Sequence, residues 1–240
     1  MKKKPDIYVF TDFDGTITSK DIGDEIFKEF GQFEPYHSQL QNGDLKIDDY
    51  WRTVCSTFKS GTDAETIKDY ALNCETDPYF KKFADYCKES EIPLSVISDG
   101  FDVYIDPVLK KINADWLPFF SNKLFFDNNG KANPHFPLAS ESCNCLCASC
   151  KRNAILQNVP EDAVIVFIGD GYSDYCAAEH SDIIFAKKNL AAYCNEKRLP
   201  HYPFSTFFDV YRIITDIIPK KKLKIRNQAK LLRNKAYETE

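Results

Sequence analysis

The sequence has no long hydrophobic run and no strong excess of charge of one sign. No apolar stretch approaches the roughly 20 residues that a membrane-spanning helix needs. Lys and Arg total 31 against 36 Asp and Glu, a net charge of −5, which gives no reason to expect binding to nucleic acid or to a membrane. The N-terminus (MKKKPD) is not followed by the longer apolar segment and small-residue cleavage site of a secretory signal. We therefore expect a cytoplasmic protein.

Internal repeats, low-complexity segments and a secreted disulfide framework are also lacking. The nine cysteines are an odd number, and four of them crowd together at Cys143, Cys145, Cys147 and Cys150, which is not typical of such a framework. The chain has 240 residues and is 43% hydrophobic. That is enough for one α/β domain with a sizeable core and an inserted element.

Three short apolar runs predict buried strands, at residues 7–10, 93–97 and 164–168. Helical patterns between them indicate a parallel sheet with helices on both faces. Each run leads into a polar residue, Asp12, Ser98 or Asp170. Because ligands of such folds bind outside the carboxyl ends of the strands, we expect these three residues to meet in one site.

Two segments interrupt the alternation of strands and helices. Residues 19–76 are polar and helical in pattern, which predicts a small cap inserted after the first strand. Two β-like runs around the turn at residues 127–130 predict a hairpin. We expect a catalytic core of residues 1–18 and 77–219, with the hairpin and the cysteine cluster at about 118–150, and a basic tail at 220–240 that forms a solvated helix or frayed terminus.

The segment Asp12-Phe13-Asp14-Gly15-Thr16 carries the strongest chemical signal. Two carboxylates directly after a buried strand are costly unless they meet a cation or a ligand. Asp12 can attack phosphorus to form an aspartyl-phosphate, and Asp14 can protonate the leaving oxygen and later activate water. The alternative is an Asx-turn at the end of the strand.

The segment from Gly169 to Asp174 (GDGYSD) indicates a metal site. Mg²⁺ prefers carboxylate and carbonyl oxygens, so Asp12 and Asp170 could share one ion, with Asp174 as an orienting group or water-mediated ligand. Asp174 could instead only cap a helix. Ser98 can donate to a phosphoryl oxygen, and Lys151 can neutralise charge on the nucleophile and the phosphoryl group.

The order of these motifs, Asp-x-Asp-Gly-Thr, Ser, Lys and Gly-Asp-x-x-x-Asp, resembles that of haloacid dehalogenase superfamily phosphatases. The resemblance implies a Rossmann-like parallel sheet and Mg²⁺ held by Asp12, Asp170 and the backbone carbonyl of Asp14. It also implies that Asp12 is the nucleophile, that Asp14 is the acid/base, and that Ser98 and Lys151 bind the phosphoryl group with help from the backbone of Gly100. Asp14 favours phosphatase or phosphomutase chemistry, because the dehalogenases and ion pumps of the superfamily lack a carboxylate there.

The predicted cap resembles that of the phosphoserine phosphatase branch, through Gly43, Leu45 and Arg52. This resemblance makes Arg52 a candidate reader of a substrate carboxylate, since guanidinium binds carboxylate through two hydrogen bonds. The alternative is a solvated arginine on a helix face. Asp21 stands where that branch usually has a Glu that meets the substrate amine, so Asp21 is a candidate substrate-binding residue with one methylene less.

Three other features resemble the 2-hydroxy-3-keto-5-methylthiopentenyl-1-phosphate phosphatases: DFDGTIT at residues 12–18, the cysteine-rich stretch before Lys151, and LPHYPFSTFF at residues 199–208. We therefore expect an enzyme that hydrolyses a small phosphomonoester, an enolised sugar phosphate of the methionine-salvage type. A phosphoserine phosphatase, a phosphotransferase or phosphomutase, and a non-catalytic binding protein are the alternatives.

The cysteine cluster has two interpretations. Cys143, Cys145, Cys147 and Cys150 could hold a structural Zn²⁺, although only the last pair has the C-x-x-C spacing of a zinc knuckle. They could instead be paired or reduced structural cysteines. In either case their place beside Lys151 suggests that they help to hold that lysine.

Overall fold

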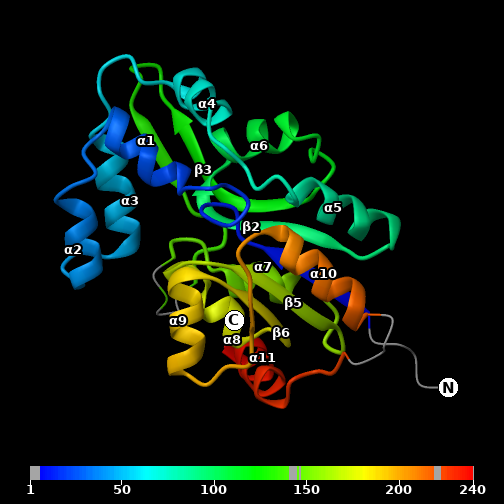
Figure 1. Ribbon diagram of the computed structural model, residues 1–240. Coiled ribbons are helices and arrows are strands. Elements are labelled where there is room, and N and C mark those ends of the chain that lie inside the picture. Colours follow the sequence, from blue (N-terminus) through cyan, green and yellow to red (C-terminus); the bar gives the residue numbers. More distant parts are fainter. Residues whose placement is uncertain (1–5, 141–144, 146, 219–222, 240) are drawn as a thin grey trace.

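A seven-stranded sheet forms the centre of the computed structural model, which describes residues 6–140, 145, 147–218 and 223–239 (Figure 1). The strands are β1 (Ile7–Thr11), β2 (Leu94–Phe101), β3 (Phe119–Phe126), β4 (Ala132–His135), β5 (Val164–Gly169), β6 (Ile183–Ala186) and β7 (Tyr202–Pro203). Their order is β4-β3-β2-β1-β5-β6-β7, and only β4 runs antiparallel to its neighbour. This confirms the predicted α/β fold with a parallel sheet.

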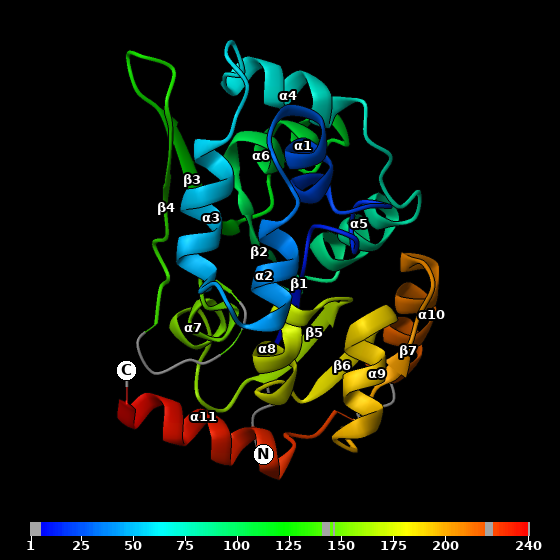
Figure 2. The same ribbon diagram turned by 90° about the vertical axis from the view of Figure 1, so that its left-hand side faces the viewer.

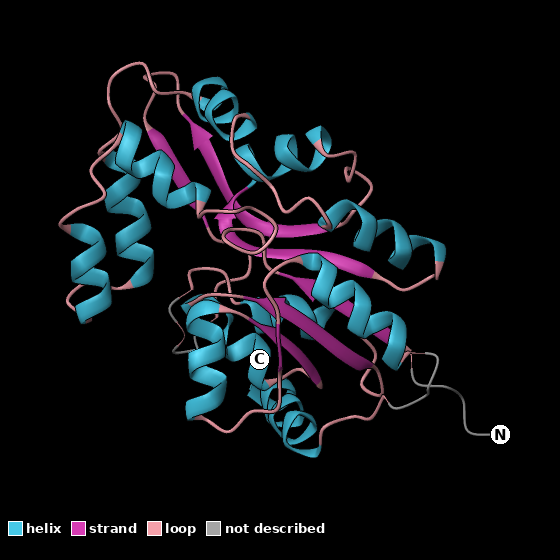
Figure 3. Cartoon of the chain, in the orientation of Figure 1, coloured by secondary structure: helices cyan, strands magenta, loops and turns pink. Residues whose placement is uncertain are grey.

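Both faces of the sheet are buried, which is why its central strands are continuous apolar runs. Side chains alternate along β5: Val166 and Ile168 pack into one hydrophobic cluster, and Ile165 and Phe167 pack into the other. Helices α5 (Phe80–Glu89), α6 (Asp102–Lys111) and α10 (Phe207–Ile217) contribute to the first cluster. Helices α7 (Lys151–Gln157), α8 (Tyr175–Glu179) and α9 (Lys188–Glu196) contribute to the second. Figure 3 shows the strands between these helices.

Four helices lie between β1 and α5 in the chain: α1 (Ile22–Phe30), α2 (Tyr36–Asn42), α3 (Ile47–Ser56) and α4 (Ala64–Leu72). Helices α2 and α3 pack side by side over one end of the sheet, whereas α4 packs against α6 of the core (Figures 1 and 2). The β3–β4 hairpin packs against α3, and the rings of Phe58 and Phe126 stack with centroids 6.5 Å apart. The hairpin therefore supports the inserted helices.

The C-terminal segment is docked on the core, which contradicts the expectation of a solvated or frayed tail. Helix α11 (Asn227–Thr239) runs beneath the core in Figure 2. Arg226 donates to the backbone carbonyls of Ala178, Glu179 and Ser181 at the end of α8. Arg233 is 2% exposed and pairs with Asp182 at 3.2 Å. The basic residues of this segment alone predict a solvated helix, because the groups that Arg226 and Arg233 contact lie more than 40 residues earlier in the sequence. No helix within the described ranges is both long and apolar enough to cross a membrane.

Candidate active site

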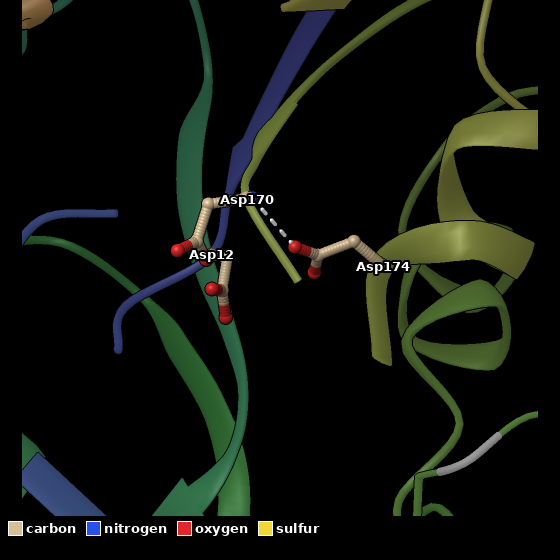
Figure 4. Close-up of side chains that lie close together, drawn as sticks. All are labelled: Asp12, Asp170 and Asp174. Carbon is tan, nitrogen blue, oxygen red and sulfur yellow. Dashed lines mark hydrogen bonds between the residues drawn. The ribbon is translucent and has the colours of Figure 1, made fainter. Parts of the chain in front are cut away.

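Three carboxylates meet where β1 and β5 end. Asp12 follows β1, Asp170 follows β5, and Asp174 lies in the short 3-10 helix Tyr172–Asp174 before α8 (Figure 4). One oxygen from each lies within 4.8 Å of the others, and all three residues are buried. Such a group of hard oxygen donors suits a divalent cation such as Mg²⁺. The acidic residues that the sequence predicts for a metal site are therefore side by side.

Lys151, the first residue of α7, joins two of these carboxylates. Its Nζ donates to Asp12 Oδ1 at 2.5 Å and to Asp174 Oδ1 at 2.6 Å, and the lysine is 1% exposed. Burial opposes the ammonium charge, but Asp12 and Asp174 outweigh it and raise the pKa of Lys151, so the lysine stays charged. Burial raises the pKa of Asp12 well above its usual value, and the charge of Asp174 adds to this. One buried ammonium does not balance the charge of three ionised carboxylates, so a further cation would be stabilised there.

Asp174 contacts Lys151 with one carboxylate oxygen and the loop after β5 with the other. Its Oδ2 accepts hydrogen bonds from the backbone N–H groups of Asp170 and Gly171, both at 2.9 Å. A Cβ atom at Gly169 would lie 2.4 Å from that oxygen, so the close approach requires glycine. Asp174 therefore ties the loop after β5 to Lys151, as expected of an orienting group.

Asp14 lines the same pocket as Asp12 and Asp170, and it accepts hydrogen bonds at both carboxylate oxygens. Oδ1 accepts from the backbone N–H of Ile22 at 2.9 Å. Oδ2 accepts from the Tyr104 hydroxyl at 2.8 Å and from Ser98 Oγ at 3.3 Å. Burial, together with the nearby charge of Asp21, raises the pKa of Asp14 to about 8. A carboxyl group with such a pKa can both give and take a proton near neutral pH.

Asp99, which follows Ser98 within β2, was missed from the sequence. Its Oδ1 accepts from the backbone N–H groups of Ala148 and Ser149 at 2.9 and 3.0 Å, and its Oδ2 accepts from Trp51 Nε1 of α3 at 3.3 Å. One carboxylate thus connects β2 to the cysteine-rich loop and to the helices above the site. Burial raises its pKa to about 6. Its position beside Ser98 in the sequence was the only available signal.

A pocket of about 350 Å³ opens above these residues. Its core side is lined by Asp12, Asp14, Ser98, Gly100 and Asp170, and its other side by residues of α1, α2 and α3. The side formed by α2 and α3 carries the apolar and aromatic residues Leu40, Ile47, Tyr50 and Trp51, and also the polar residues His37 and Gln41. Helices inserted after the first strand therefore do cover the site.

The two candidate substrate-binding residues of this insertion have different positions. Asp21 lines the pocket and caps α1, where its Oδ1 accepts from the Asp24 backbone N–H at 2.8 Å. Asp21 is exposed, and partial desolvation together with the charge of Asp24 raises its pKa. Arg52 is exposed, is not among the pocket-lining residues, and lies 5.3 Å from the Phe136 ring centroid. Because α3 turns its Trp51 toward the pocket, the adjacent Arg52 faces the hairpin, and the structure does not support it as a substrate reader.

Gly100 has a structural role as well as a place on the pocket. Its backbone N–H donates to Ser98 Oγ at 2.9 Å, which orients that hydroxyl. Lys188 is a further residue that sequence reasoning missed. It lines the pocket, its Nζ lies 2.8 Å from Asp170 Oδ2, and its backbone φ of 46° is unusual for a residue other than glycine. No motif marks this lysine.

The cysteine cluster is only partly described. Cys143 lies outside the described residues. Within the described part of the chain, Asp12, Asp170 and Asp174 form a group with metal-ligand spacing, whereas Cys145, Cys147 and Cys150 do not. The fit to zinc that the sequence suggested is therefore not supported. Cys150 directly precedes Lys151 and donates its backbone N–H to the Leu138 carbonyl at 2.8 Å, and a role of the cluster in holding the lysine stays a prediction.

Comparisons with known proteins agree with this site. Residues 9–179 match the haloacid dehalogenase-like hydrolase family. A 2-hydroxy-3-keto-5-methylthiopentenyl-1-phosphate phosphatase of Bacillus pumilus is 31% identical, over 87% of this chain and 90% of its own length. The enzyme of the same name from Brevibacillus brevis is 28% identical, over 90% of this chain and 98% of its own. A solved phosphoserine phosphatase, described as a phospho-aspartyl intermediate analogue, has a TM-score of 0.66 and 18% identity, and covers 89% of this chain and all of its own.

The chain belongs to the haloacid dehalogenase-like hydrolases, since the family model spans well over half of it and includes both strands that end at the acidic trio. The curated relatives named above are phosphatases, and the solved phosphoserine phosphatase shares the fold of this chain.

Proposed function

We propose that the protein hydrolyses a small phosphomonoester through an aspartyl-phosphate on Asp12, with Mg²⁺ held by Asp12, Asp170 and the backbone carbonyl of Asp14. One observation carries this proposal. The Lys151 ammonium bridges Asp12 and Asp174 at the carboxyl ends of β1 and β5, beside Asp170 and under a pocket that Asp14 also lines. The groups that the proposal needs are therefore close together: the nucleophile Asp12, the charge-neutralising Lys151, the metal ligand Asp170 and the acid/base Asp14.

In the first step, an oxygen of Asp12 attacks phosphorus and the bond from phosphorus to the leaving oxygen breaks. Lys151 binds Asp12 at Oδ1, which fixes the carboxylate and leaves Oδ2 for attack. Asp14 donates its proton to the leaving oxygen. Ser98 turns its hydroxyl from Asp14 to a phosphoryl oxygen, with its Oγ still held by the Gly100 N–H. A bound Mg²⁺ would add charge neutralisation at the phosphoryl oxygens.

In the second step, water attacks the phosphorus of the aspartyl-phosphate. Asp14, now ionised, takes the proton of that water, and the bond between phosphorus and Asp12 breaks to release inorganic phosphate. The pKa of about 8 for Asp14 supports both roles, because the group can be protonated before the first step and can accept a proton in the second.

The shape and chemistry of the pocket favour a substrate whose non-phosphate part is uncharged and partly apolar. Leu40, Ile47, Tyr50 and Trp51 form an apolar wall on the side of the pocket that α2 and α3 line, beside His37 and Gln41. Lys188 is the one lysine or arginine among the described lining residues, and it is already paired with Asp170. A thioether tail would bury apolar surface on this wall. We therefore place the substrate in the class named for the relatives, an enolised methylthio-sugar phosphate.

A phosphorylated amine is the second candidate, and the acidic end of α1 favours it. Asp21 and Asp24 both line the pocket, and desolvation raises the pKa of both carboxyl groups, that of Asp24 to about 6, although Asp21 is exposed. An ammonium group placed there would stabilise the ionised carboxylates. Phosphoserine carries such an ammonium group, but its carboxylate would need a cation other than Arg52.

The test is phosphate release in the presence of Mg²⁺, with wild type beside Asp12→Asn. The panel holds an enolisable methylthio-sugar phosphate, phosphoserine and 4-nitrophenyl phosphate. We expect wild type to turn over the first compound with the highest kcat/KM and Asp12→Asn to release no phosphate, because an amide cannot act as the nucleophile. Higher kcat/KM on phosphoserine would favour the second candidate.

Two controls make the loss interpretable. Asp162→Asn removes an exposed carboxylate outside the site and should leave turnover unchanged. Circular dichroism should show that Asp12→Asn is folded. Full activity of a folded Asp12→Asn protein would refute the aspartyl-phosphate mechanism.

A further inference from the structure

Tyr104 places a buried hydroxyl against the acid/base carboxylate. It lies in the first turn of α6, directly after β2, and is 1% exposed. Its hydroxyl donates to Asp14 Oδ2 at 2.8 Å, and the residue lines the pocket. A buried tyrosine hydroxyl needs a partner, and this one has taken the catalytic carboxyl group.

The backbone beneath this contact is shaped to allow it. A Cβ atom at Gly100 would lie 1.9 Å from the Tyr104 hydroxyl and 2.6 Å from Asp14 Oδ2. Any side chain at position 100 would therefore displace one member of the pair. The contact thus depends on a glycine four residues before the tyrosine, a matched arrangement rather than incidental packing.

The three donors around Asp14 are not equivalent. The Ile22 N–H holds Oδ1, whereas Tyr104 and Ser98 share Oδ2, with Tyr104 closer by half an ångström (2.8 against 3.3 Å). In the proposed mechanism Ser98 turns to the phosphoryl group. Tyr104 is then the side-chain donor that stays on Oδ2. Since a protonated carboxyl oxygen keeps a lone pair, Tyr104 can hold this oxygen in both steps.

We infer that Tyr104 is a positioning residue of this phosphatase, which holds the Asp14 carboxyl group in the orientation needed to protonate the leaving oxygen. This inference rests on the proposed function, because it assigns Tyr104 a role through Asp14. Without the hydroxyl, the carboxyl group can rotate away from its position over Gly100 when Ser98 leaves it, and proton transfer depends on that geometry.

The test compares Tyr104→Phe with wild type on two leaving groups. An alkyl phosphate, here the enolisable methylthio-sugar phosphate of the panel, needs protonation of its leaving oxygen, whereas 4-nitrophenolate leaves without a proton. Because kcat/KM covers the steps up to loss of the leaving group, we expect it to fall about tenfold or more for the alkyl phosphate, a part of the usual general-acid contribution, and within about twofold for the aryl phosphate.

The matched control is Tyr193→Phe, which removes another tyrosine-to-carboxylate hydrogen bond, to Glu179 at 2.6 Å, outside the pocket. It should change neither value of kcat/KM. An equal loss of kcat/KM on both substrates by Tyr104→Phe would show a merely structural role and overturn the inference, as would no loss on either. Asp12→Asn run in the same assays separates the two proposals: if it stays active, the proposed function fails, and the Tyr104 inference fails with it.

Discussion

Lys188 lies where it would compete with a cation for the proposed metal site. Its ammonium lies 2.8 Å from Asp170 Oδ2, on a residue whose φ of 46° carries a backbone cost. Asp170 is one of the three clustered carboxylates that suit a divalent cation. The lysine and the cation therefore oppose each other at the same carboxylate.

We expect Lys188→Met to bind Mg²⁺ more tightly than wild type. The Lys188 side chain is 53% exposed, so solvent screens the pair, and an exposed pair contributes about 0.2–1 kcal/mol. The dissociation constant of Mg²⁺, measured by calorimetry without substrate, should fall about 1.5- to 5-fold. Lys197→Met, at the end of the same helix and paired with Glu196, should not change it. Weaker Mg²⁺ binding by Lys188→Met would mean instead that the lysine holds Asp170 ready for the ion.

The residues that sequence analysis could predict at the site are those fixed by strand ends. Asp12 and Asp170 each follow a continuous apolar run, and parallel pairing of β1 with β5 brings such ends together. Tyr104, Asp99 and Lys188 could not be predicted in the same way. Their contacts with Asp14, Trp51 and Asp170 arise from packing between distant elements, which a single sequence does not display.

At the scale of elements, a hydrogen bond to Asp99, the residue after Ser98, connects α3 to the core. Trp51 donates from Nε1 to Asp99 Oδ2 at 3.3 Å, and its ring lies edge-on to Phe101 of β2 with centroids 5.1 Å apart. Tyr50 and Ile47 of the same helix line the pocket. A shift of α3 would therefore move the apolar wall of the pocket and disturb the strand segment that carries Ser98.

We predict that Trp51→Phe raises KM with little change in kcat. Phenylalanine keeps an aromatic ring against Phe101 but loses the N–H, and a hydrogen bond of this kind contributes about 0.5–1.5 kcal/mol. If the bond favours the covered pocket, KM should rise about 2- to 12-fold in phosphate-release kinetics. The chain has only one other tryptophan, Trp116, whose ring contacts Lys88 outside the pocket. Trp116→Phe should leave KM unchanged, and a fall in kcat at constant KM for Trp51→Phe would contradict this account.

Elements with a strong local pattern can be predicted in place, whereas weaker patterns predict only a general region. The predicted strand at 164–168 is β5, because five consecutive apolar residues fit a strand buried on both faces. Helix α2 lies within the predicted helical region 19–76, but its own bounds carry little signal, since Pro35 precedes it without a side-chain cap and only Leu40 is buried. The place of the hairpin against α3 depends on Phe58 and Phe126, which lie 68 residues apart, and no local pattern records that contact.

At the scale of the whole molecule, the active site should lower the stability of the fold when it is ionised. Burial raises the pKa of Asp14 to about 8 and of Asp99 to about 6, from about 4 in an unfolded chain. The pKa of Asp21 is raised as well, but Asp21 is exposed, so solvent screens its contribution. Between these values the folded protein binds more protons than the unfolded one. Its stability is therefore greatest below about pH 4 as far as these groups are concerned, and falls as the pH rises from about 4 to about 8.

We expect the urea midpoint of the metal-free protein, measured in chelator, to be lower at pH 8.5 than at pH 5.5. Asp14→Asn should reduce that difference, because it replaces the carboxyl group with the highest of these pKa values by an amide, which does not titrate. The exposed Asp162→Asn should leave the difference unchanged. Mg²⁺ should raise the midpoint more at pH 8.5 than at 5.5, since it binds ionised carboxylates of the folded state. A midpoint that rises from pH 5.5 to 8.5 without metal would show that the hydrogen bonds from Tyr104, Ile22 and Trp51 outweigh the cost of burying these charges.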